Sequence, residues 1–323
     1  MSLQSIKNKL PKVSIIIPCK YIDSYTEQCV QYCKNLDYPE FEIIVLPDED
    51  NDKKLEGVKI IPTGNVSPGK KRNMGIEKSS GELLAFIDSD AYPRKDWLKN
   101  AIKYFNDDKI AAVGGPGITP EDDSDMQKAS GYVLSSFLVG NLSSRFKIKK
   151  AYESDDIHSC NFIARRDVIE KVKWNEKYWP GEDTLMCLGI KKMGLKMLEV
   201  PDVVVYHHRK PLFIPHIKQI SRFGLHRGFF VKKFPENSRK ITYFIPSFFV
   251  LYLLFGSILS IFNQTLRILF MLSLVAYLIL AFIGALHAKR PKLIFLTWLG
   301  IIITHIVYGV SFLIGLAKKE LER

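Results

Sequence analysis

Residues 83–93 read LLAFIDSDAYP, and this stretch decides the expected fold. An apolar run typical of a buried strand stops at Asp88, and a second carboxylate, Asp90, follows two residues later. Side chains two residues apart on an extended chain point to the same side. The stretch therefore predicts a buried strand that ends in two acids facing one cation.

Apolar strands alternate with helices on both sides of this stretch. Strands are predicted within 13–19, 41–50, 58–62, 83–88, 110–118 and 200–208, and a strand followed by a short helix within 160–172. Such alternation favours an α/β domain with a mostly parallel sheet. Ligands of such sheets bind beyond the carboxyl ends of the strands, which is where Pro18, Asp48 and the two aspartates fall.

The last quarter of the chain has a membrane-like composition. Residues 243–262 and 268–286 contain no charged residue, and 293–317 contain no Lys, Arg, Asp or Glu and one histidine, His305. About 20 apolar residues span the hydrocarbon layer as a helix, and three such runs with short connectors favour membrane spans over buried core helices. We therefore expect a catalytic domain over 1–240 and an all-α transmembrane region of three helices over 241–323. The polar start, MSLQSIKNKLPK, has no signal-peptide pattern.

The net charge of +12 is concentrated next to the membrane region. Residues 209–240 carry nine Lys and Arg side chains against one acid, Glu236, which indicates contact with anionic lipid rather than nucleic acid. Within this part, 212–234 have the pattern of an amphipathic helix, either interfacial or packed on the protein. The connector HAKRPK is also basic, so the positive-inside rule places the catalytic domain in the cytoplasm of a multi-pass cell-membrane protein. The basic tail KKELER then lies on the opposite side, against the rule.

Asp88 and Asp90 resemble half of a site for Mg²⁺ or Mn²⁺. Mg²⁺ usually takes one or two protein carboxylates and completes its coordination with water and substrate phosphates. This pattern indicates a phosphate-bearing substrate, although a helix cap or a solvated strand end is the simpler alternative.

A basic turn, PGKKRNMG, supplies the expected phosphate side. Lys70, Lys71 and Arg72 surround the start of a helix, where amide groups and positive side chains favour an anion. The turn lacks the glycine spacing of a P-loop or a dinucleotide fingerprint. A solvated basic face is the alternative.

The stretch WPGEDTL places Glu182 and Asp183 at the start of another helix. Asp183 could serve as the N-cap, as a general base that accepts a proton from an incoming hydroxyl, or as both. Two histidines, His207 and His208, end the last predicted strand and alternate faces, so at most one points inward. We expect His208 to be a third metal ligand; a solvated or phosphate-contacting histidine is the alternative.

Together these motifs resemble the inverting glycosyltransferases of family 2, over roughly residues 11–230. The matching elements are VSIIIPC, the turn Arg72-Asn73-Met74-Gly75, the run GELLAFIDSD with its DXD motif, the pair Glu182-Asp183, and QISRF at 219–223. The resemblance implies a GT-A fold, which is Rossmann-like and typical of nucleotide-diphospho-sugar transferases. It also implies a nucleotide-sugar donor.

The resemblance also implies roles for individual residues. Asp88 is expected near the ribose and the metal, Asp90 on the metal, and Asp183 as the catalytic base. The donor-binding residues are expected to be Pro18, Asp48, Lys70, Arg72, Asn73 and Asp88, and the acceptor or membrane side to include Glu182, Gln219 and Arg222. Where the family commonly has two successive aspartates, this chain has Pro47-Asp48, which weakens the preference for a UDP-sugar.

The sequence thus predicts a membrane-bound, metal-dependent, inverting hexosyltransferase. The site next to a membrane favours a lipid-linked acceptor in glycan, exopolysaccharide or cell-envelope assembly. A polyprenyl-phosphate hexose synthase and a processive polysaccharide synthase are alternatives, although three helices are few for a polysaccharide channel. More remote are a sugar nucleotidyltransferase, whose glycine-rich N-terminal loop has no counterpart here, and a non-enzymatic membrane scaffold.

Overall fold

The computed structural model describes residues 10–50, 55–139 and 148–321, so most of the polar start of the chain lies outside the described residues. The chain divides into two compact units. The first comprises 1–117 and 148–207, and the second 118–147 and 208–323. These two units are compact bodies and do not correspond to the two predicted domains. The boundary at residue 240 between a catalytic domain and a membrane region stays a prediction.

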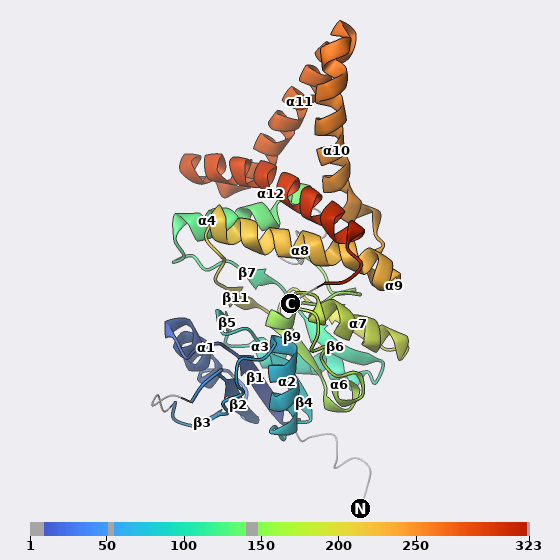
Figure 1. Cartoon of the computed structure of the whole chain (residues 1–323). Helices are drawn as coiled ribbons and strands as arrows, with labels where there is room; N and C mark the ends of the chain where they lie inside the picture. The colour runs from blue at the N-terminus through green and yellow to red at the C-terminus, as the bar shows by residue number, and fades with distance from the viewer. Residues whose placement is uncertain (1–9, 51–54, 140–147, 322–323) are drawn as a thin grey trace, which may run out of the picture. The chain divides into compact units, whose positions relative to one another are not determined.

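The first unit is built on an eight-stranded sheet of order β3-β2-β1-β4-β9-β6-β10-β8 (Figure 1). Its strands are β1 (Val13–Pro18), β2 (Phe41–Leu46), β3 (Val58–Ile60), β4 (Leu83–Phe86), β6 (Ile110–Gly114), β8 (Tyr152–Glu153), β9 (Phe162–Arg165) and β10 (Lys196–Glu199). β3, β2, β1 and β4 are mutually parallel, and β6 is parallel to β10. β9 runs antiparallel between β4 and β6, and β8 runs antiparallel to β10.

Helices cover both faces of this sheet because the strands are apolar on both sides. These helices are α1 (Ser24–Lys34), α2 (Pro68–Glu77), α3 (Trp97–Ile102), α6 (Arg166–Val172) and α7 (Glu182–Lys192), with the short turns η1 (Lys103–Asn106) and η3 (Ser159–Asn161). Ile15 and Ile17 of β1 belong to one buried cluster with α1 and α3, whereas Ile16 belongs to another with α2, α6 and α7. Because β1 pairs parallel with both β2 and β4, the carboxyl ends of these three strands lie at one edge of the sheet.

The first strand of a small second sheet, β5, directly follows the DXD motif in the chain. β5 (Ala91–Pro93), β11 (Val205–His207) and β7 (Gly117–Ile118) form it in the order β5-β11-β7. β5 and β11 are antiparallel, and His207 pairs with Ala91. This register brings the end of the last strand beside Asp90.

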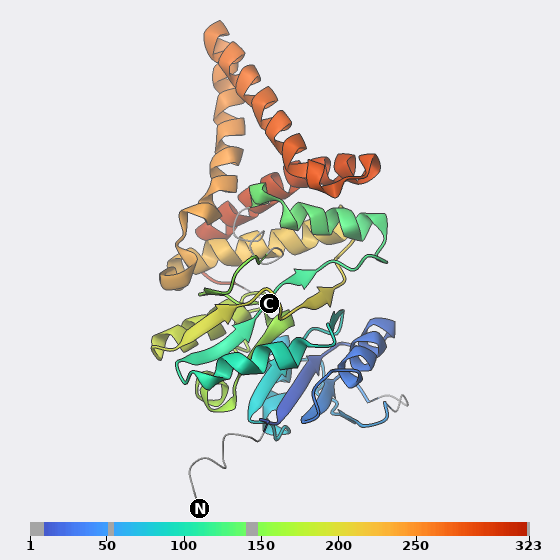
Figure 2. The same ribbon diagram turned by 180° about the vertical axis from the view of Figure 1, so that it is seen from behind.

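The second unit is helical. Its elements are α4 (Asp125–Ser135), η2 (Phe137–Val139), α8 (Ile214–Lys233), α9 (Pro235–Ser238), α10 (Ile241–Phe262), α11 (Gln264–Ala285), η4 (Leu286–Ala288) and α12 (Pro291–Ala317). A capping box formed by Ser124 and Gln127 opens α4. Three helical segments, 241–262, 264–288 and 291–317, are long and apolar enough to cross a membrane. Figure 2 shows α10 and α11 as a hairpin, and α12 beside α8.

The predicted α/β order is confirmed, with two differences. The sheet contains more antiparallel pairing than expected, because β9 lies antiparallel between β4 and β6. The strands β5, β8 and β10 were not predicted.

Candidate active site

Three potential metal ligands converge after β4. Asp88, Asp90 and His207 each offer a ligand atom, and these atoms lie within 4.8 Å of one another. The His207 Nε2 lies 3.2 Å from Asp90 Oδ1, and all three residues are partly exposed. Two carboxylate oxygens with one imidazole nitrogen suit Mn²⁺ or Mg²⁺, with coordination positions left for water and phosphate oxygens. The donor set therefore fits the ion expected from the sequence.

The histidine of this group is His207, and the expectation for His208 needs correction. His208 is buried in the second unit, where its Nδ1 lies 2.5 Å from Asp123 Oδ1. Successive residues of a strand face opposite ways, so only one of the two can join the aspartates. The pairing of β11 with β5 selects His207.

This assignment predicts different metal affinities for two neighbouring variants. His207→Ala should weaken Mn²⁺ binding by about 10- to 100-fold or more, the range typical even for outer-sphere partners of metal ligands. His208→Ala is the matched control and should leave Mn²⁺ affinity unchanged. Electron paramagnetic resonance of free Mn²⁺, recorded while purified protein is titrated, gives the Mn²⁺ affinity of each variant. An equal loss of affinity in the two variants would contradict the assignment.

Arg72 on α2 connects the DXD motif to the Glu182-Asp183 pair. Its Nη2 donates to Asp88 Oδ1 and to Ser159 Oγ, each at 3.0 Å, and its Nη1 donates to Glu182 Oε1 at 2.9 Å. The guanidinium also lies over the ring of Trp174, 4.8 Å from its centroid. The side chain is 3% exposed. Arg72 thus holds the Asp88 and Glu182 carboxylates on one guanidinium, and its expected role in donor binding stays a prediction.

Glu182 is 4% exposed and paired with Arg72. Its assignment to the acceptor side stays a prediction. Burial raises the pKa of Glu182 to about 7, Arg72 opposes this rise, and the neighbouring Asp183 adds to it. The Glu182 carboxylate accepts a hydrogen bond from Arg72 and so helps to hold the Arg72 side chain in place.

Asp183 lies in the first turn of α7, after Gly181 as the N-cap. The left-handed backbone of Gly181, with φ of 117°, favours glycine at this turn. The Thr184 N–H donates to Asp183 Oδ1 at 2.8 Å, and the Asp183 side chain is half-buried. A carboxylate at a helix start is stabilised in its charged form by the helix amides. Its role as base stays a prediction.

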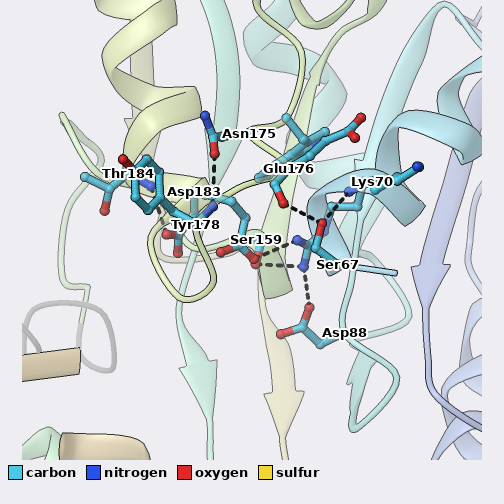
Figure 3. A network of polar contacts seen from close by, with 12 residues as sticks. Ser67, Lys70, Asp88, Ser159, Asn175, Glu176, Tyr178, Asp183 and Thr184 are labelled. Atoms are coloured by element: carbon cyan, nitrogen blue, oxygen red, sulfur yellow. Dashed lines mark hydrogen bonds and ion pairs between the residues drawn. The ribbon is translucent and has the colours of Figure 1, made fainter. Parts of the chain in front are cut away.

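The segment 174–176, which precedes Asp183 in the chain, is fastened to α2 by hydrogen bonds. Figure 3 shows the Ser67–Glu176 contact. Ser67 Oγ donates to the Glu176 carbonyl at 2.9 Å. Asn73 exchanges two hydrogen bonds of 2.9 Å with the Trp174 backbone, one in each direction. A Cβ on Gly69 would lie 2.2 Å from the Asn175 carbonyl oxygen. Asn73 therefore holds this segment in place, and its expected contact with the donor stays a prediction.

The basic turn separates into an exposed and a buried side chain. Lys70 is exposed, and in Figure 3 its amine points away from Asp88. Lys71 is buried, and its Nζ donates to Asp48 Oδ1 at 2.5 Å and to the Cys19 carbonyl at 2.7 Å. Pro18 and Asp48, at the ends of β1 and β2, are buried beside this lysine. Their role in binding the nucleotide stays a prediction.

Gln219 and Arg222 lie on α8 in the second unit. Gln219 is half-buried and Arg222 is exposed. Their assignment to the acceptor side stays a prediction.

Sequence reasoning missed three contributors to the site, Ser67, Ser159 and Trp174, and the pairing of Lys71 with Asp48. The periodicity of α2 was a usable signal for Lys71, because positions 71, 72, 75 and 76 form one helical face with Gly75 and Ile76. Ser159 and Trp174 gave no such signal, since each meets Arg72 only through long-range folding.

The comparison with protein families agrees with this geometry. Residues 14–173 match the family model Glycosyl transferase family 2. The chain contains a family 2 glycosyltransferase domain. The described part of this domain has the α/β architecture of the GT-A type, with helices on both faces of the sheet.

Relatives of this chain include two transferases whose names specify lipid-linked substrates. It is 24% identical, over 68% of its length and 74% of the relative's, to dolichyl N-acetyl-alpha-D-glucosaminyl phosphate 3-beta-D-2,3-diacetamido-2,3-dideoxy-beta-D-glucuronosyltransferase of Methanococcus voltae. It is 23% identical, over 54% of its length and 59% of the relative's, to GalNAc(5)-diNAcBac-PP-undecaprenol beta-1,3-glucosyltransferase of Campylobacter jejuni.

A solved structure resembles this chain over nearly its whole length. The mannosyltransferase PcManGT of Pyrobaculum calidifontis, in complex with GDP-Man and Mn²⁺, matches with a TM-score of 0.57 and 18% identity. The match covers 97% of this chain and 89% of that one. At this identity the likeness establishes the fold.

Proposed function

We propose that this chain transfers one sugar from a nucleotide-sugar donor to a lipid-linked acceptor, with inversion at the anomeric carbon. The observation that carries the proposal is the position of Arg72. One guanidinium contacts both Asp88 of the DXD motif and Glu182, the neighbour of Asp183. The expected metal ligands and the expected base therefore belong to one site. The names of the two relatives support a lipid-linked acceptor.

The donor side is formed by the two sets of acids at the strand ends. Asp88, Asp90 and His207 would hold Mg²⁺ or Mn²⁺, and a divalent ion at this place offsets the negative charge that grows on a departing diphosphate. Lys71 fixes the Asp48 carboxylate, which can accept a hydrogen bond from an N–H of the nucleotide base. Uridine is the first base to test because of the family resemblance, and guanosine is the second because the structural neighbour holds GDP-Man.

The acceptor side depends on Asp183. Its carboxylate accepts the proton of an acceptor hydroxyl while the hydroxyl oxygen forms a bond to the anomeric carbon. The bond from that carbon to the diphosphate oxygen breaks on the opposite face, and the electron pair leaves with the diphosphate. One displacement of this kind inverts the anomeric configuration. Arg72 and the segment fastened to α2 hold the α7 start in register with the DXD motif.

We further propose that the catalytic domain, over 1–240, lies on the cytoplasmic side of the cell membrane and that 241–323 form the membrane region. The support is the distribution of charge. Nine basic residues precede the first apolar helix within 209–240, as the positive-inside rule requires of a cytoplasmic segment.

A donor panel tests the function. Protein in lipid nanodiscs with Mn²⁺ is supplied with UDP- and GDP-sugars, with or without a polyprenyl-linked saccharide extract, and release of nucleoside diphosphate is measured. We expect release from a single donor class that rises strongly when the extract is added and disappears in Asp90→Asn. Release that responds to water-soluble saccharides but not to the extract would contradict the lipid-linked acceptor.

A further inference from the structure

The apolar helix α12 is packed along the basic helix α8 over most of its length. Gly224 and Gly228 of α8 leave no room for a Cβ, because one would lie 2.7 Å from the Tyr308 carbonyl and the other 2.1 Å from the Phe312 carbonyl. Gly315 of α12 has the same relation to the Leu225 carbonyl, at 2.0 Å. Figures 1 and 2 both show the two helices side by side. Backbone therefore meets backbone, and the two helices form one layered unit.

A buried histidine adds a polar connection between these helices and α4. His216 of α8 contacts Ser130 of α4 through Nδ1 and Thr304 of α12 through Nε2, both at 2.8 Å. Burial lowers the pKa of His216 to about 4, so the ring is neutral at physiological pH. Further along, Ser221 and Ser311 hydroxyls lie 3.0 Å apart. The order of these contacts shows that α8 and α12 run in the same direction.

Both ends of α12 are attached to charged groups of this layer. At its start, Arg290 and Lys292 pair with Asp125 of α4, at 3.2 and 2.8 Å. At its end, the Lys318 carbonyl accepts a hydrogen bond of 2.6 Å from Lys232 Nζ of α8. The two attachment points are separated by the full length of α12, about 40 Å for its 27 residues.

These contacts argue against α12 crossing a membrane. A crossing α12 would carry the parallel α8 through the hydrocarbon layer with it. Four basic residues of α8 are exposed: Lys218, Arg222, Lys232 and Lys233. Charged side chains inside the bilayer are costly and rare, whereas an amphipathic basic helix is stable in the headgroup layer.

The hairpin of α10 and α11 has the opposite character. Both helices have 22 residues, enough for about 33 Å, and their outer halves expose apolar side chains such as Phe255 and Leu272. The turn between them, around Asn263, is polar and carries only Arg267 as a charged residue. Such a hairpin is suited to cross and return.

We propose that only α10 and α11 cross the membrane, and that α12 lies in the plane of one leaflet with its outer face in lipid. Phe295, Ile306, Val310 and Ile314 form that face; they are 38–55% exposed and, at about 100° per residue, occupy one arc away from the buried Thr304 and Ser311. The catalytic domain and the carboxyl terminus then lie on the same side. The basic tail KKELER joins the other basic segments there, which removes the conflict with the positive-inside rule that three crossings create.

Depth measurements on α12 test this proposal directly. Nitroxide labels at Phe295→Cys, Ile306→Cys and Ile314→Cys are placed in protein reconstituted into phosphatidylcholine and phosphatidylglycerol vesicles, and accessibility to oxygen and to a nickel chelate gives their depth. A helix in the leaflet plane predicts similar, shallow depths at all three positions. A label at residue 306 near the midplane, with 295 and 314 near opposite surfaces, would overturn the proposal.

The side of the carboxyl terminus gives an independent test. Thr265→Cys at the hairpin turn, Glu320→Cys in the tail and Lys78→Cys in the catalytic domain are each exposed positions, and the five native cysteines are buried. A membrane-impermeant maleimide applied to sealed vesicles of each orientation should label residues 320 and 78 together, and residue 265 in the opposite orientation. Labelling of 320 together with 265 would establish a third crossing. Neither test requires transferase activity, so a failure of the proposed function does not affect them.

Discussion

Replacing Asp183 with asparagine is expected to reduce sugar transfer by about 10²- to 10⁴-fold, the usual contribution of a general base. Asparagine has nearly the same shape and can accept the Thr184 N–H, so the start of α7 should be retained. It cannot take the proton of an acceptor hydroxyl. Because the donor is held by other residues, its affinity should change little, and the loss should appear in kcat rather than in donor binding.

Asp167→Asn is the matched control for this experiment. Asp167 is an exposed aspartate on α6 that lies 4.0 Å from Lys171 Nζ. This variant should transfer sugar at the wild-type rate. Calorimetry with the donor and a turnover assay with labelled sugar measure both quantities for each variant. Near-normal turnover in Asp183→Asn would show that another group is the base.

Replacing Arg72 with methionine is expected to have the largest effect on stability. The variant leaves Glu182 buried without its cation, and breaking a buried ion pair by removing one partner typically costs about 3–5 kcal/mol. Replacing both partners, in Arg72→Met with Glu182→Gln, should recover much of this loss, because an uncharged amide is cheaper to bury. The stability of the wild type, of each single variant and of the double variant is measured by thermal unfolding in detergent, followed by circular dichroism. The four values form a double-mutant cycle.

The single variant Arg72→Met should also lose stability as the pH rises. An unfolded chain titrates Glu182 near 4.5, and the folded pKa of about 7 rises further when Arg72 is absent. A carboxyl group with a raised folded pKa contributes most to stability below its unfolded pKa, and the contribution is lost as pH rises through the folded value. The deficit of Arg72→Met relative to wild type should therefore be greater at about pH 8 than at about pH 6. The double variant, which has no carboxyl group at 182, should lack this difference; a deficit independent of pH would contradict the account.

The sequence was most informative where chemistry and local structure coincide. Asp88 and Asp90 could be placed at the end of a buried strand because the apolar run before them is long enough to predict β4. The start of α7 was predicted for a similar reason, since a glycine and two acids precede an apolar helix. The three apolar helices followed from length and composition alone.

Partners that arise from long-range folding could not be predicted. Arg72 and Asn73 belong to a basic turn that suggests phosphate binding, yet both contact protein groups 16 to 110 residues away. The choice between His207 and His208 depends on how β11 pairs with β5, a three-residue strand without a sequence signature. Likewise, α12 has the composition of a membrane span, and only its contacts with α8 show that part of its surface is covered by protein.

The most direct test of the central claim is the chemical structure of the lipid product. Membranes containing the protein are incubated with the active nucleotide sugar and Mn²⁺, the lipids are extracted, and the product is examined by mass spectrometry and by NMR of the new anomeric centre. We predict a mass increase of one sugar and an anomeric configuration opposite to that of the donor. A ladder of several added sugars, a retained configuration, or label found only in water-soluble material would contradict it.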